Sequence, residues 1–173
     1  MEQISDIYIF LGRFHALFVH LPIGFISLAI LLEIGVRWMK FERYMPVIPF
    51  LWMLAAISSI VSVALGYSLS LGGGYDEETL YWHRLGGFCL IGVTLACSFL
   101  TWSRLPVVPV FGRPLYLVFV AAAAVLLVIT GHNGGSLTHG NTYLTEFAPA
   151  MLGGPKADTT QGAKPKGPIL HPD

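Results

Sequence analysis

Apolar residues occur in four long runs, separated by short segments that are polar or contain proline and glycine. Each run approaches the roughly 20 residues that an α-helix needs to cross a hydrocarbon core of about 30 Å. Apolar and polar positions do not alternate with period two, as they would in the strands of a β-barrel. The pattern therefore predicts four transmembrane helices, at about residues 14–38, 46–71, 82–102 and 114–131.

The connections between these runs are short and contain helix-breaking residues, among them Pro46, Pro106 and the glycines of residues 72–74. Short connections make neighbouring helices antiparallel. We expect an all-α membrane protein, an antiparallel up-down four-helix bundle that occupies residues 1–149. In this domain a segment rich in His and Gly, residues 132–149, follows the last helix. Residues 150–173 are polar and rich in Gly and Pro, which predicts a disordered or extended tail. No internal repeat is evident.

Composition supports the membrane assignment and excludes other classes. Residues of the apolar and aromatic types make up 54% of the chain, and charged residues only 12%, against roughly 25% charged in soluble domains. Ten basic residues balance ten acidic ones. The chain therefore lacks the basic surface of a nucleic-acid-binding protein.

Basic residues also predict the orientation of the bundle. The first and third connections carry five of them, and the opposite side of the bundle carries Arg13 and Arg84 among several acidic residues. Cytoplasmic loops of membrane proteins are enriched in Lys and Arg. We expect a multi-pass protein of the bacterial inner (cytoplasmic) membrane with both termini in the periplasm. The five cations on the cytoplasmic side are Arg37, Lys40, Arg43, Arg104 and Arg113.

Histidine is the most informative residue type. The chain has six, and the predicted topology places all but His171 at the periplasmic end of the bundle. Ionisable residues at membrane depth are costly and commonly mark function. A single histidine near a membrane interface is more often a hydrogen-bonded amphipathic residue than a ligand. Five from three helices indicate a shared centre: His15, His20, His83, His132 and His139.

Two kinds of centre fit these histidines. Zinc or copper would accept three or four imidazoles, whereas a b-type haem needs two, from helices on opposite faces of the ring. The aromatic residues nearby favour haem. We expect His20 and His83 to be the axial pair, since the first and third helices lie diagonally, and His15 with His132 or His139 to hold a second haem. Arg13 and Arg84 either bind haem propionates or anchor the membrane interface. The glycines beside His83 and His132 either allow close helix packing or make room for a flat ring.

Three motifs resemble a known family. Residues 12–24, GRFHALFVHLPIG, resemble the opening G-R-F-H-P-L-x-V-H-x-P-I-G of a four-helix bacterial membrane family that is often fused to planctomycete-type cytochrome c domains. Residues 73–76, GGYD, with 82–84, WHR, and residues 131–146, GHNGGSLTHGNTYLTE, resemble its other two signatures. The likeness covers residues 12–149, with Ala16 in place of the usual proline. It implies an electron-transfer setting beside c-type haem. We expect any c-type cytochrome partner to be a separate polypeptide.

These observations predict a membrane electron-transfer subunit, rather than a stand-alone enzyme, that binds one or two non-covalent b haems. It would exchange electrons with a c-type cytochrome or a quinol, and its partners would be that cytochrome, other membrane subunits, lipid and quinone, without nucleic acid. Two alternatives stay open. One is a non-redox accessory or anchoring subunit of a larger complex, and the other is a subunit that binds a transition metal or bacteriochlorophyll.

Overall fold

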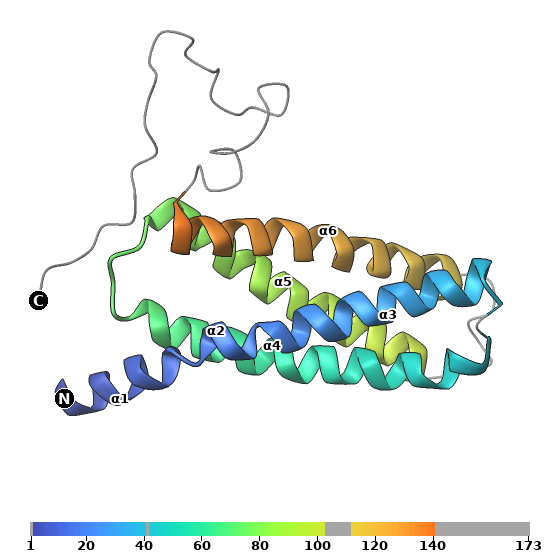
Figure 1. The fold of residues 1–173 in the computed structure, drawn as a ribbon, viewed down its shortest axis with the longest axis horizontal. Coiled ribbons are helices and arrows are strands. Elements are labelled where there is room, and N and C mark those ends of the chain that lie inside the picture. Colours follow the sequence, from blue (N-terminus) through green and yellow to red (C-terminus); the bar gives the residue numbers. More distant parts are fainter. Residues whose placement is uncertain (1, 41, 103–111, 141–173) are drawn as a thin grey trace, which may run out of the picture.

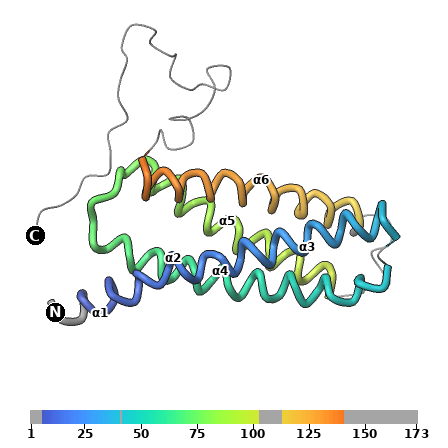
Figure 2. The backbone as a smooth tube through the Cα atoms, in the orientation of Figure 1, coloured from blue at the N-terminus to red at the C-terminus, as the bar shows by residue number. Residues whose placement is uncertain are grey.

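The computed structural model describes residues 2–40, 42–102 and 112–140, and these residues form helices joined by short turns (Figures 1 and 2). Three consecutive helices, α1 to α3, make the first rod, and each of the other three rods is dominated by one long helix. The elements are α1 Glu2–Gly12, α2 His15–Phe18, α3 His20–Trp38, the 3-10 helix η1 Glu42–Val47, α4 Ile48–Ser70, α5 Glu77–Trp102 and α6 Gly112–His139.

The four rods are long and apolar enough to cross a membrane, as the hydrophobic pattern predicts. They run alternately up and down (Figure 1). Helix α3 packs against α4 and α6, and α5 packs against the same two helices. Helices α3 and α5 therefore occupy opposite corners of the bundle. Large apolar side chains such as Leu17 and Val128 point outward, 67% and 71% exposed, as expected for a lipid-facing surface. The predicted four-helix fold is confirmed.

Three helix boundaries differ from the sequence prediction, and one of them is the start of α5, which lies at Glu77 rather than near residue 82. Helix α6 continues to His139, eight residues past its expected end, because Gly134 lies against the His83 ring of α5 rather than ending the helix. The stop is Gly140, which has φ +89° and whose N–H donates to the Ser136 carbonyl at 2.9 Å. At the other end of the chain, α1 extends the first rod backward beyond a break at residues 13–14. The predicted tail, residues 150–173, lies outside the described residues.

Asp76 fixes the beginning of α5, the helix that carries His83. Its carboxylate accepts hydrogen bonds from the Thr79 backbone N–H at 2.9 Å and from the Thr79 hydroxyl at 2.6 Å. Both bonds favour the charged carboxylate and lower the pKa of Asp76. A negative charge at this position also complements the helix dipole. The start of α5, two turns before His83, is therefore determined by sequence-local interactions.

A buried polar network joins three helices near the opposite end of the bundle from the histidines. The Trp52 indole N–H donates to the Tyr116 hydroxyl at 2.9 Å, and the Tyr116 hydroxyl donates to the Glu33 carboxylate. Arg37, one turn along α3, pairs with the same carboxylate. Trp52 is fully buried, and Glu33 is only 7% exposed. Buried polar groups need such partners, because each one left without a hydrogen bond costs free energy.

Replacing Tyr116 by Phe tests this network. The substitution leaves the Trp52 N–H and one Glu33 oxygen without their partner, and we expect a loss of about 1–3 kcal/mol in unfolding free energy. The measurement is thermal unfolding of the purified protein in detergent. Tyr8→Phe is the matched control, because the Tyr8 side chain is 51% exposed on α1. Equal unfolding temperatures for the two variants would contradict the assigned role.

Candidate histidine site

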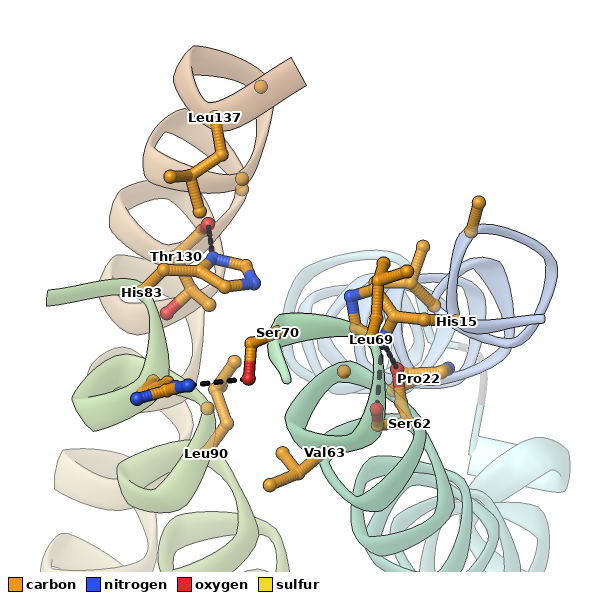
Figure 3. A pocket seen from close by; sticks show the side chains of 18 of the residues that line it. His15, Pro22, Ser62, Val63, Leu69, Ser70, His83, Leu90, Thr130 and Leu137 are labelled. Atoms are coloured by element: carbon orange, nitrogen blue, oxygen red, sulfur yellow. Dashed lines mark hydrogen bonds between the residues drawn. The ribbon is translucent and has the colours of Figure 1, made fainter. Parts of the chain in front are cut away.

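A cavity of about 470 Å³ lies inside the bundle, at the end where the five histidines gather. Its wall is mostly apolar and is built from α2, α3, α4, α5, α6 and the turn between α4 and α5. Figure 3 shows this cavity with His15 and His83 on opposite sides. Four of the five candidate histidines line the cavity, namely His15, His20, His83 and His139. His132 does not line it.

His15 is held against α4. Its Nδ1 lies 2.8 Å from the Ser62 carbonyl oxygen. One turn further along α4 is Gly66, and a Cβ atom built there would come within 2.9 Å of the His15 ring. Real Cβ atoms do not approach other atoms so closely. Gly66 therefore provides the space that the imidazole occupies.

His83 is held against α6 in the same way. Its Nδ1 lies 3.0 Å from the Thr130 carbonyl oxygen, and a Cβ at Gly134, one turn further along α6, would come within 2.9 Å of its ring. From the sequence, the glycines near His132 are compatible either with close helix packing or with room for a flat ring. Gly134 accommodates a flat ring, and that ring is the imidazole of His83.

The two hydrogen bonds determine which nitrogen of each neutral imidazole carries the proton. A backbone carbonyl can only accept, so Nδ1 is the donor in both rings and Nε2 keeps its lone pair. The ring centroids are 6.2 Å apart, and the ring planes are nearly perpendicular at 87°. In Figure 3 the second nitrogen of each ring faces the other ring across the gap. The site presents two opposed, unprotonated imidazole nitrogens.

The two half-sites are related by a constant offset of 68 residues. His15, Ser62 and Gly66 correspond to His83, Thr130 and Gly134. The correspondence extends along the two helices, since residues 62–72, SVALGYSLSLG, align with residues 130–140, TGHNGGSLTHG. The expectation from the sequence that the chain has no internal repeat is therefore wrong. The repeat is difficult to recognise in the sequence because its similar part is only about three helical turns long.

The cavity wall follows the same offset. Of its 28 lining residues, 24 form pairs that are 68 positions apart. Since α3 corresponds to α5 and α4 to α6, and each pair occupies diagonal corners, the two hairpins are related by an approximate twofold rotation about the bundle axis. The cavity lies on this axis. It is built by two similar halves, each of which contributes one histidine.

The other sequence candidates have different surroundings. His20 lines the cavity but is exposed, and its Nδ1 lies 3.3 Å from the carbonyl oxygen of Leu17 in the preceding short helix α2. His139 is exposed and also lines the cavity, whereas His132 lines a separate polar depression beside Asp76. Arg13 is exposed and is not part of the cavity wall. The structure thus brings His83 together with His15 rather than with His20.

Comparison with known proteins identifies the family. The family described as "Predicted membrane protein (DUF2231)" matches residues 13–143, well over half of the chain. The chain belongs to this family, which has no known function. No curated protein and no solved structure matches the chain.

The glycine contacts predict a specific pattern of stabilities. Gly66→Ala and Gly134→Ala place a methyl group against a fixed imidazole, and we expect each to cost about 1–3 kcal/mol of unfolding free energy. The controls are Gly24→Ala and Gly92→Ala, which are also 68 residues apart and have no atom near the new Cβ. These should be neutral or slightly stabilising. Thermal unfolding in detergent measures all four.

A double-mutant cycle isolates the clash. If Gly66→Ala acts on the His15 ring, its cost disappears in a His15→Ala background, because the ring is no longer there. The same holds for Gly134→Ala with His83→Ala. A cost that persists in both backgrounds would show that the glycines serve some other contact.

Proposed function

We propose that this member of the DUF2231 family binds one b-type haem through His15 and His83, and that it transfers single electrons at the periplasmic end of a bacterial cytoplasmic membrane. The observation that carries the proposal is the pair of opposed imidazoles, each with Nδ1 bound to a backbone carbonyl and Nε2 directed into an apolar cavity. Metal-bound histidines characteristically donate their other ring N–H to a carbonyl or carboxylate in this way.

The separation of the rings fits one metal ion between them. A metal–imidazole bond of about 2 Å puts the ion about 3 Å from each ring centroid, so two rings on opposite sides of one ion are about 6 Å apart. The observed centroid separation is 6.2 Å. Cofactor pockets generally measure about 300–1,000 Å³, and this cavity, at about 470 Å³, lies in that range.

The number of ligands favours a macrocycle over a bare ion. Structural zinc takes four protein ligands, and catalytic zinc three. Within the described parts of the chain, no group of three or more His, Cys, Asp or Glu side chains is placed to hold a metal. An iron porphyrin supplies four nitrogen donors of its own, so the two histidines complete its coordination. The described residues bring one pair of histidine rings together, which supports one haem rather than two.

The site residues determine what such a centre would do. When bound, haem supplies a one-electron redox couple. His15 and His83 would both be ligands of its iron, so oxygen would find no free position there. The mostly apolar wall would limit the access of water to the ligands. Because the cavity lies at one end of the bundle, a redox partner would approach there, and the resemblance of the three sequence motifs points to a c-type cytochrome, with quinol as the other donor or acceptor class.

Reconstitution with ferric protoporphyrin IX tests the proposal. We expect the purified protein to bind one equivalent and to show a sharp α-band in the reduced-minus-oxidised spectrum. His15→Ala and His83→Ala should each abolish the six-coordinate low-spin spectrum, because each removes one axial ligand. His20→Ala and His132→Ala are the controls and should keep it.

Two measurements guard against misinterpretation. Thermal unfolding of each variant without porphyrin separates ligand loss from misfolding, and His83→Met should shift the spectrum to that of a His–Met centre. A wild-type protein that binds no porphyrin would contradict the proposal and would favour the non-redox accessory role. A low-spin spectrum that survives in both His15→Ala and His83→Ala would show that other residues are the ligands.

A further inference from the structure

Arg84 places a positive charge in the cavity wall, and no acidic side chain in the described part of the chain pairs with it. It follows His83 on α5, about 10 Å of helix from the first residue of α5. Its Nη2 donates a hydrogen bond to the Ser70 hydroxyl, and its guanidinium lies 5.2 Å from the Tyr67 ring centroid. Its Nε is buried and has no hydrogen-bond partner among the residues that the structure describes. The one salt bridge among the described residues, Arg37 with Glu33, lies at the far end of the bundle.

This arrangement differs from an arginine that only extends toward the membrane surface. Such a side chain keeps its charged head in water, whereas Arg84 is held by α4 through Ser70 and Tyr67 and lines the cavity with both of them. A charge at this depth is costly unless something compensates it. No acidic side chain among the described residues compensates this charge, and the cavity that Arg84 lines has room for an anion.

The two halves of the site differ in charge. The position equivalent to Arg84 is Ala16, which lines the same cavity, and the position equivalent to Tyr67 is Gly135. The halves therefore share the imidazole, the carbonyl that holds it and the glycine beside it, but only one half carries a cation. A ligand of this cavity meets two equal nitrogen donors and a positive charge on one side.

We infer that Arg84, positioned by Ser70 and Tyr67, forms an anion subsite that binds a carboxylate of the ligand held between His15 and His83. This inference rests on the proposed function, and the ligand class is then a porphyrin with free acid side chains. Guanidinium–carboxylate pairs are among the strongest hydrogen-bonded pairs in proteins, and more so away from water. The subsite would select acidic porphyrins over neutral ones.

Esterification of the ligand provides the test. Wild type and Arg84→Gln are titrated with ferric protoporphyrin IX and with its dimethyl ester, in which both carboxylates are neutral. Hydrogen bonds to charged groups typically correspond to about 10- to 100-fold in affinity. We expect wild type to bind the free acid at least about tenfold more tightly than the ester, and Arg84→Gln to bind both with equal affinity. Arg13→Gln, at an exposed arginine outside the cavity, should behave as wild type.

A relocated charge strengthens the test. In Ala16→Arg combined with Arg84→Gln, the cation moves to the equivalent position of the other half, and the preference for the free acid should return. A double variant without that preference would overturn the equivalence of the two positions. An Arg84→Gln protein that still prefers the acid tenfold, with a normal low-spin spectrum, would overturn the subsite alone. Failure of wild type to bind either porphyrin would overturn the subsite together with the proposed function.

Discussion

The hydrogen bond from an imidazole Nδ1 to a helix carbonyl is the interaction on which this site depends. At membrane depth, a histidine needs a partner for its N–H, because unsatisfied polar groups are costly where water is absent. A helix carbonyl already accepts a bond within its helix, but it has a second lone pair. Ser62 and Thr130 use it to hold His15 and His83. The bond satisfies the N–H of the half-buried ring, sets its tautomer and directs the remaining nitrogen into the cavity.

The approximate twofold relation explains how a small chain can build such a site. One helical hairpin offers a single imidazole, and two donors on the same regular helix seldom face one centre. Rotation of a second, similar hairpin by half a turn places an equal donor directly opposite the first. Glycine is required at Gly66 and Gly134 because the helix must lie close enough for its carbonyl to reach the ring. Any side chain at these two positions would separate donor and acceptor.

The sequence predicts the fold well, because long apolar runs and short Pro- and Gly-rich connections allow few arrangements. It also brings the five histidines to one end. The pairing of His15 with His83 does not follow from the sequence pattern, because in one regular helix over residues 14–38 His20 would be the deeper residue. The helix in fact breaks at residues 13–14 and again at Val19, three residues before Pro22. The break at Val19 has a physical cause, because a proline ring clashes with the backbone of the helical turn before it. Helix α2 thereby turns His15 toward α4. The signal in the sequence that pairs His15 with His83 is the similarity of the chain to itself at an offset of 68 residues.

The likeness of the two halves is confined to the end that holds the cavity. At the opposite end, the network of Glu33, Trp52 and Tyr116 has no counterpart, since the equivalent positions are Thr101, Val120 and Ile48. A packing interface between two hairpins can be stabilised by many different side chains, so nothing physical keeps its two sides alike. Two equal donors to one centre are more demanding, because each ring needs the same distance to its carbonyl and the same space beside it. The likeness of the two halves therefore lies where the proposed function would require two equal donors, and Arg84, whose counterpart is Ala16, breaks that likeness on one side of the cavity.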